Sequence, residues 1–366
     1  MKLLRSYTLR ELVVPFCLAL LFFTFIFIFG NLVKIADMII NKGFNFFDVF
    51  RIIVLLIPWL FSFTLPTATI TAVLLVFGTM AGNYEIMAMK ACGVNLFRLV
   101  LPVLVVSIVL SIVSLIMNDQ ILPKTHFAYR KAVKNILVKQ PLAYIEAGRF
   151  IKEFDDYVIF VREIDGNQLK NITIYIPQEG QPTRTVLAEK GEIITDPVKK
   201  TISLRLYNGT TDEPDPNNPG VFHKVDFRMT ELPPLHVDDT GKLGKKTKDM
   251  TIDELVHKMQ GEDDRLNSKT HLINKLKAEI HNKISFSFAP FVFTLIGLPL
   301  AMITRRGNVL VSFLLSMIVI TVYYVLFAFA KTIAVQGLVT PLVALWLPNV
   351  LLILVGAVLM LKVVRT

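Results

Sequence analysis

Six long apolar runs constrain the fold of this chain more than any other feature. Each run reaches the roughly 20 residues that a helix needs to cross a hydrocarbon core of about 30 Å. The runs lie at about 12–33, 52–79, 97–117, 286–304, 309–330 and 341–361. With 53% hydrophobic residues and a mean hydropathy of +0.56, the chain is too apolar for a water-soluble globule. We therefore expect a membrane α-helical bundle of six transmembrane helices.

The first apolar run has two interpretations, because Lys2, Arg5 and Arg10 precede it as they would precede the core of a signal peptide. The run is longer than the usual core of about 7–15 residues, and no small-residue cleavage site follows it. We therefore expect a membrane helix here.

The positive charges outside the segment 118–283 are distributed asymmetrically. Nine lie at the two termini and in the second and fourth loops: Lys2, Arg5, Arg10, Lys90, Arg98, Arg305, Arg306, Lys362 and Arg365. Four lie in the opposite short loops: Lys34, Lys42, Arg51 and Lys331. Because cytoplasmic loops carry an excess of Lys and Arg, we expect both termini in the cytoplasm.

The polar segment Asn118–Lys283 then lies on the outer, periplasmic side. It holds 26 basic and 25 acidic residues, so the chain's net charge of +10 belongs mostly to the membrane part. A neutral domain without a basic stripe does not predict a nucleic-acid partner.

Between about 143 and 235 the pattern changes to short alternating segments. Examples are "YVIFVREI", "LKNITIYIP" and "TISLRLYNGT", separated by turns such as "DGN" and "DEPDPNNPG". About seven strands fit here, and alternation between turn signals predicts an inserted all-β, jellyroll-like domain, as a sandwich or barrel. The flanks of this region read as helical. Thr251 and Glu254 form a potential capping box at the start of one flanking helix.

Motifs for metal binding or catalysis are missing from the sequence. Cys17 and Cys92 are the only cysteines, so no disulfide framework is expected. The six histidines show no close ligand spacing, and "GKLGKKTK" departs from the phosphate-loop pattern. The sequence shows no nucleotide loop and no Ser/His/Asp constellation, so we do not expect an enzyme.

The membrane runs show no Asp, Glu, Lys or Arg at mid-span, so they lack the buried charges of ion pathways. The second run contains Pro58 and Pro66, which should kink it. A kinked helix can line a transport cavity, or it can reflect packing alone.

The short stretch "MAGNYEIMAMKACGVN" joins the second and third runs. We expect a helix at about 84–92, capped by Asn83 and ended by Gly93 in the left-handed region. Glu85 at its start would complement the helix N-terminus, worth roughly 0.3–1 kcal/mol.

The chain resembles the LptF/LptG (YjgP/YjgQ) permeases of the lipopolysaccharide exporter. The resemblance rests on "LPTATITAVLLVFGTMAGNYEIMAMKACGV", "FVFTLIGLPLAMITRRG" and "LWLPNVLL", and it covers essentially the whole chain. "ADMIINKGFN" and the "ACG" loop lean toward the F paralogue. The resemblance implies helices 1–3 at 1–117, a periplasmic segment at 118–283 and helices 4–6 at 284–366.

The same resemblance implies a bacterial inner-membrane permease with three kinds of partner. These are a paralogous permease, a cytoplasmic LptB-like ATPase dimer and a single-span LptC-like protein. Lipopolysaccharide is the implied cargo, extracted from the inner membrane and passed to a periplasmic bridge. No cofactor is implied for this chain, because ATP acts through the partner ATPase.

In this family the helix after the second span is a coupling helix that docks in a groove of the ATPase. Glu85 would pair there with a basic group. The other implied contacts are Tyr84, Ile86, Met87, Met89 and Lys90. This role and the complementing of the helix N-terminus are compatible.

On the outer side, the resemblance makes Lys34 a contact for the phosphates of lipid A. The alternative is a lysine that only snorkels to the headgroups. Lys42, Arg51 and Lys331 are further candidates, and Ile174 represents a β-domain interior that would shield acyl chains. A tightly packed β core without room for lipid is the other interpretation.

A function of another class also fits the architecture: a membrane-anchored scaffold or mechanical transmitter that recruits periplasmic proteins through its β domain. A scaffold needs no coupling helix and no lateral cavity. Co-purification of an ATPase and lipopolysaccharide would distinguish the two.

Overall fold

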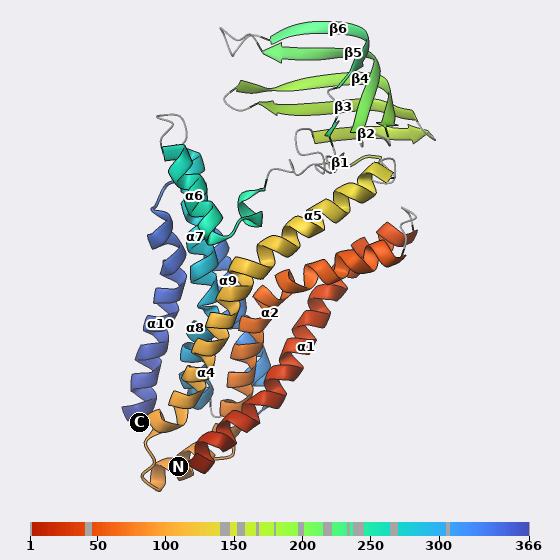
Figure 1. Cartoon of the computed structure of the whole chain (residues 1–366). Coiled ribbons are helices and arrows are strands. Elements are labelled where there is room, and N and C mark those ends of the chain that lie inside the picture. The colour runs from red at the N-terminus through yellow and green to blue at the C-terminus, as the bar shows by residue number, and fades with distance from the viewer. Residues whose placement is uncertain are drawn as a thin grey trace. The chain divides into compact units, whose positions relative to one another are not determined.

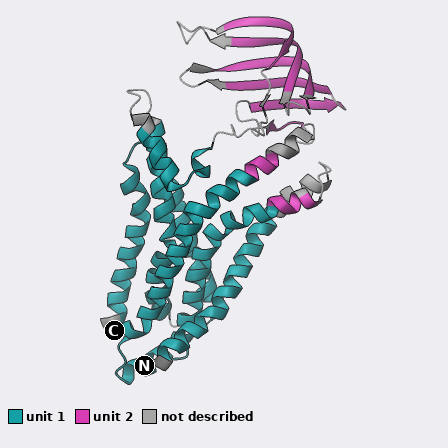
Figure 2. Ribbon diagram, viewed as in Figure 1, with its two compact units in different colours: residues 1–33, 53–128, 245–366 teal, residues 34–52, 129–244 magenta. Residues whose placement is uncertain are grey.

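The computed structural model divides into two compact units, each described here by itself (Figure 2). Unit 1 comprises residues 1–33, 53–128 and 245–366, and unit 2 comprises 34–52 and 129–244. The structure describes residues 2–40, 46–139, 147–151, 158–165, 168–178, 181–196, 201–214, 222–232, 235–236, 245–263, 270–304 and 308–365.

Helices build unit 1, and parts of α1, α2 and α5 belong to unit 2 (Figure 1). The helices are α1 (Lys2–Ile40), α2 (Phe46–Gly82), α3 (Glu85–Ala91), α4 (Leu96–Ile116), the π-helix η1 (Met117–Ile121), α5 (Leu122–Lys139), the 3₁₀ helix η3 (Thr247–Asp249), α6 (Ile252–Asp263), α7 (Thr270–Ser287), α8 (Ala289–Thr304), α9 (Val309–Gln336) and α10 (Pro341–Arg365).

Five stretches of the described chain are long and apolar enough to cross a membrane, and a bent pair, α7 with α8, makes a sixth. The two helices of this pair meet at 42°. The predicted membrane helical bundle is confirmed. The fourth span, predicted at 286–304, gains a preceding arm, so Glu279 and Lys283 fall within the bent pair. Both residues precede the predicted span, so the expectation that mid-span charges are absent stays a prediction.

The helix boundaries follow local capping chemistry. Asn95 Oδ1 accepts a hydrogen bond from Phe97 N at 2.9 Å at the start of α4, and Asn308 Oδ1 does the same for Leu310 N at the start of α9. These bonds satisfy backbone donors that a helix N-terminus leaves free. At the other end of α4 the chain does not stop, because the π-helix η1 carries it directly into α5.

The second half of α2 supplies the centre of the unit 1 core. Ala68, Ile70 and Phe77 are fully buried, and Phe293 of α8 and Tyr323 of α9 are fully buried as well. Pro58 and Pro66 lie inside α2, and Figure 1 shows that this helix bends along its length. A proline removes one backbone donor from the helix and favours such a bend.

One antiparallel sheet forms most of unit 2. Its strands are β1 (Phe150–Ile151), β2 (Val158–Asp165), β3 (Gln168–Gln178), β4 (Gln181–Asp196), β5 (Thr201–Pro214), β6 (Phe222–Glu231) and β7 (Leu235–His236). Strands β1 to β6 pair in chain order, and β7 pairs with β5. The inserted all-β domain is therefore confirmed, whereas closure as a jellyroll stays a prediction.

On several strands of this sheet, two successive side chains point outward, where regular alternation would place only one. Asn171 (φ 51°) and Asn208 (φ 48°) adopt left-handed conformations, and both lie between the pairs Ile172↔Ala188↔Gly209 and Lys170↔Lys190↔Tyr207. Asparagine tolerates this conformation better than most residues. The inward-facing residues on either side of this irregularity are therefore three positions apart along each strand, and not two. This irregularity bends the sheet. Figure 1 shows β4, β5 and β6 curving along their length.

Candidate functional site

The short helix α3 begins and ends by different means. Tyr84 is its N-cap residue, with a left-handed φ of 62° and no side-chain cap. Asn83 N donates to Thr79 O at 2.8 Å and thereby completes the last turn of α2. The prediction that Asn83 caps α3 is therefore wrong, because the Asn83 amide bonds back to α2 and Tyr84 takes the N-cap position.

The C-terminal end of α3 agrees with the sequence prediction. Gly93 has φ 77°, its amide donates to Lys90 O at 2.9 Å, and Val94 N donates to Met89 O at 3.0 Å. These two bonds form a Schellman motif, in which glycine adopts the left-handed region without a Cβ penalty.

Two sides of α3 differ in exposure. Ile86 is 7% exposed, and half-buried Met89 packs against the core of unit 1. Lys90 Nζ donates to Val363 O near the C-terminus at 2.8 Å. By contrast, the side chains of Tyr84 and Met87 are 66% and 48% exposed. The structure therefore places Ile86, Met89 and Lys90 on the anchoring side of α3.

Glu85 lies at the first turn of α3, where its carboxylate also complements the helix N-terminus. Tyr7 OH of α1 donates to Glu85 Oε2 at 3.4 Å. This contact joins α3 to the N-terminal helix. Sequence patterns do not predict it, because the two residues are 78 positions apart.

A cavity of about 380 Å³ lies beside α3. Its lining combines α3 and its N-cap residue with the ends of α2, α8 and α10: Ala81, Tyr84, Ile86, Met87, Lys90, Met302, Ile303, Lys362 and Val363. Figure 1 shows both chain termini at the same end of the helices as α3. This end of unit 1 is called the α3 end below.

A second cavity, of about 570 Å³, lies at the opposite end of unit 1. Its walls are strongly aromatic: Phe27, Trp59, Phe63, Phe286, Tyr324 and Phe327. Polar and charged side chains complete the lining: Ser62, Asn118, His126, Lys248, Glu279, Asn282, Lys283 and Lys331. An aromatic floor with several cations suits an anionic amphiphile, because ring faces pack on hydrocarbon and lysines attract anions.

The predicted substrate contacts lie in different parts of the structure, and the side chains of two of them are not described by it. Lys331 lines this cavity, with Nζ 3.2 Å from Glu279 Oε2. Arg51 is exposed on α2 and belongs to unit 2. Lys42 and the side chain of Lys34 lie outside the described residues. Ile174 is fully buried in the sheet of unit 2.

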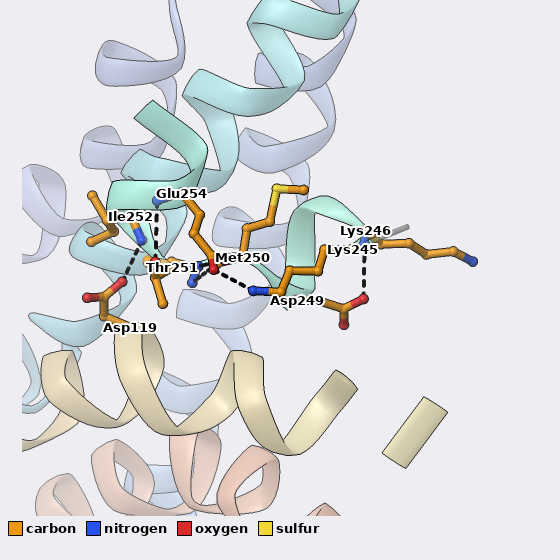
Figure 3. Close-up of polar contacts among 9 residues, drawn as sticks. Asp119, Lys245, Lys246, Asp249, Met250, Thr251, Ile252 and Glu254 are labelled. Atoms are coloured by element: carbon orange, nitrogen blue, oxygen red, sulfur yellow. Dashed lines mark hydrogen bonds and ion pairs between the residues drawn. The ribbon is translucent and has the colours of Figure 1, made fainter. Parts of the chain in front are cut away.

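A polar junction borders the cavity where the chain re-enters unit 1 from unit 2 (Figure 3). Ile252 N donates to Asp119 Oδ1 of η1 at 2.7 Å, and Lys283 Nζ of α7 donates to Met250 O at 2.5 Å. His126 Nδ1 lies 2.5 Å from Asp249 Oδ1. The segment 245–254 is thus tied to three helices.

The predicted capping box of α6 is present in this junction. Thr251 N donates to Glu254 Oε2 at 3.2 Å, and Glu254 N donates to Thr251 Oγ1 at 3.3 Å. Lys245 also donates to Glu254, and this bond, opposed in part by burial, lowers the pKa of the Glu254 carboxyl.

Two buried asparagines were missed by sequence reasoning. Asn118 accepts from Ser62 Oγ at 2.6 Å and donates to Ser287 Oγ at 2.9 Å. Asn349 accepts from Tyr323 OH at 3.0 Å and donates to Ser285 O at 2.9 Å. An amide inside an apolar run was the signal for Asn349.

Metal binding was not expected from the sequence. Within the described residues, no group of three His, Cys, Asp or Glu side chains could hold a metal ion. The absence of a cofactor stays a prediction.

Comparison with known proteins agrees with the sequence resemblance. The model of the family "Lipopolysaccharide export system permease LptF/LptG" matches residues 6–362. The permease protein LptF of Escherichia coli strain K12 is 21% identical over 98% of this chain and 93% of its own length. LptF of Shigella flexneri matches equally. The lean toward the F paralogue agrees with these matches.

A stretch of 154 residues is also 25% identical to the protein RP871 of Rickettsia prowazekii. It covers 42% of this chain and 43% of that relative, so the chain spans less than half of RP871 there. The family model spans nearly the whole chain, from the first helix to the last. This chain therefore belongs to the lipopolysaccharide export permease family LptF/LptG.

Proposed function

We propose that this chain is the permease subunit of an ABC transporter that extracts lipopolysaccharide from the bacterial inner membrane and passes it to a periplasmic bridge. A partner ATPase supplies the energy. The observation that carries the proposal is the geometry of α3, whose exposed side is presented next to both chain termini. A scaffold has no use for such a helix.

Docking of the ATPase would use the exposed side of α3. Tyr84 and Met87 offer an aromatic and a flexible apolar surface, and methionine adapts well to a partner groove. Glu85 supplies a negative charge for a basic group of an LptB-like ATPase dimer. Ile86, Met89 and Lys90 anchor the helix to unit 1. A movement of α3 caused by the docked ATPase would therefore be transmitted to the ends of α1 and α10.

The orientation follows from the charge asymmetry of nine cations against four. The α3 end faces the cytoplasm, and the segment 118–283 with its β domain faces the periplasm. Exposed Cys92 and an exposed position such as Lys190 provide the test in a Cys17→Ser background. An impermeant thiol reagent should label Lys190→Cys in intact spheroplasts and leave Cys92 unmodified. The reverse pattern would overturn this topology.

Lipopolysaccharide would enter from the membrane and contact the aromatic and cationic cavity. Lys331 lines this cavity. Lys34, Lys42 and Arg51 are further candidates for contacts with the phosphates of lipopolysaccharide. A paralogous permease would form the other half of the pathway. The β domain would then receive acyl chains on the face that includes Ile174, joined at a strand edge to an LptC-like partner, since free edges otherwise invite aggregation.

Replacement of Glu85 tests the coupling role. Loss of a charge-assisted contact costs about 1.5–3 kcal/mol, or about tenfold to a hundredfold in affinity. Glu85→Ala and Glu85→Lys should therefore reduce ATPase co-purification and fail in growth complementation. Cys92→Ser, an exposed change just after α3, is the control and should behave as wild type.

Normal ATPase recovery and normal growth for both Glu85 variants would leave only the helix N-terminus role. The alternative scaffold function predicts another result. A scaffold would purify without ATPase and without lipopolysaccharide in mild detergent. It would still retain periplasmic proteins through its β domain.

A further inference from the structure

The ion pair between Lys331 and Glu279 lies within the cavity at the end opposite α3. Lys331 Nζ of α9 is 3.2 Å from Glu279 Oε2 of α7. The side chains are 32% and 12% exposed, respectively, and both line the cavity of about 570 Å³. The Glu279 carboxylate thus already pairs with the Lys331 ammonium group.

Two other basic side chains of the cavity have structural tasks. Lys283, 4% exposed, donates to Met250 O and holds the polar junction. His126 contacts Asp249 in the same junction. Lys331 instead pairs with the carboxylate of Glu279, a side chain that can rotate away. Of these three side chains, Lys331 is therefore the one best suited to exchange partners.

The charge of an incoming ligand decides whether the exchange is favourable. A carboxylate carries one negative charge, as does the phosphodiester of an ordinary phospholipid. A phosphomonoester carries about −1.5 to −2 at pH 7 and offers three acceptor oxygens. Because Lys331 is already neutralised by Glu279, a phosphodiester offers it no additional charge, whereas a phosphomonoester does.

We propose that Glu279 is a specificity-determining residue, a built-in counter-ion that yields Lys331 to a phosphomonoester-bearing glycolipid and withholds it from phosphodiester lipids. The inference rests on the proposed function, because it assigns a selection step to the proposed lipopolysaccharide pathway. Replacing Glu279 by a phosphodiester as the partner of Lys331 is unfavourable, and this discriminates against phosphodiester lipids.

The test uses the full transporter, with partner permease and ATPase, in native membranes. A photocrosslinking amino acid at Ala328, an exposed cavity-lining position, captures adjacent lipid. The measured quantity is the ratio of captured lipopolysaccharide to captured phosphatidylglycerol. In Glu279→Gln this ratio should fall by up to about fivefold, the range expected for release of one partly exposed ion pair.

Two matched variants separate charge from folding. Glu279→Asp keeps the negative charge and should keep a ratio near that of wild type. Glu279→Gln combined with Lys331→Gln removes the whole pair and should lower capture of both lipids. An unchanged ratio in Glu279→Gln, or equal ratios for the Asp and Gln variants, would overturn the inference.

The outcome for wild type separates this inference from the proposed function. If lipopolysaccharide is captured and export is normal, but the ratio of captured lipids does not change in the Glu279 variants, only the counter-ion role is refuted. Absence of any lipopolysaccharide adduct at Ala328 also refutes the counter-ion role. If a crosslinker at half-buried Ile176 of the β domain also captures none, the proposed function fails with it.

Discussion

The two ends of unit 1 are held by different kinds of contact. At the α3 end, the apolar side chains of Ile86 and Met89 and two side-chain hydrogen bonds, from Lys90 to Val363 O and from Tyr7 to Glu85, fix a seven-residue helix. At the opposite end, Asp119, Lys283 and Asn118 each make a side-chain hydrogen bond to another segment of the chain. The α3 end is therefore lightly fixed, and the opposite end is held by several side-chain hydrogen bonds.

This difference matches what each end has to do under the proposed function. A docking helix benefits from few internal bonds, because a partner can then order it. A junction between a bent span and the segment returning from the β domain must keep its geometry. Side-chain hydrogen bonds within membrane proteins contribute about 0.6 kcal/mol each on average, so rigidity requires several of them together.

The largest effect is expected from Asn349→Leu, at the buried amide that joins α7, α9 and α10. The change leaves Tyr323 OH, Ser285 O and Ser285 Oγ without their amide partner. These three lost bonds predict a destabilisation of about 2 kcal/mol. Thermal unfolding in detergent measures it, with exposed Thr321→Val as the polar-to-apolar control. Equal melting temperatures for both variants would show that this amide does not hold α7, α9 and α10 together.

A smaller effect is expected from Asp119→Ala, which removes the acceptor for Ile252 N. Loss of such a cap costs about 1 kcal/mol, which should raise hydrogen exchange at the Ile252 amide about fivefold. Asp253→Ala, an exposed acid in the same first turn, is the matched control. If both variants exchange alike, Asp119 does not stabilise the junction.

At the lightly fixed end, Lys90→Met keeps the aliphatic stem but removes the bond to Val363 O. We expect a cost of about 0.5–1.5 kcal/mol, confined to α3. Exchange of the Ala88 and Cys92 amides should accelerate while the global melting temperature stays constant. Arg98→Met removes a cation at an exposed position of the same end and controls for charge. A global loss of stability in Lys90→Met would contradict the comparison.

The smallest effect concerns Glu254 and Lys245, whose side chains are 41% and 44% exposed. The pKa of Glu254 is lowered in the folded protein. Its contribution is therefore present above the ordinary glutamate pKa of 4.5 and is lost as pH falls through the lower, folded value. Solvent screening limits it to less than about 1 kcal/mol.

Melting temperatures of wild type and Glu254→Gln measured from pH 7 down to pH 4 should therefore converge toward the acidic end. A difference that grows with falling pH would show that the Lys245 contact is not what lowers this pKa.

Much of the fold could be predicted because its determinants are local. Apolar length identified the spans, alternation between turn residues identified the strands, and the pair Thr251 and Glu254 identified a helix start. The failure at Asn83 has a physical reason: whether a residue ends one helix or begins the next depends on which carbonyl its amide reaches. Thr79 O and a left-handed Tyr84 decided that locally, and composition does not show it.

The candidate site divides in the same way. The sequence by itself determined that a short helix with Glu85, ended by Gly93, follows the second span, and that charge is asymmetric along the chain. Only the tertiary structure decided that Ile86 faces inward and Met87 outward, that Glu85 meets Tyr7, and that Glu279 faces Lys331. Those partners are separated by tens of residues or more, so packing of helices, and not local chemistry, selects them.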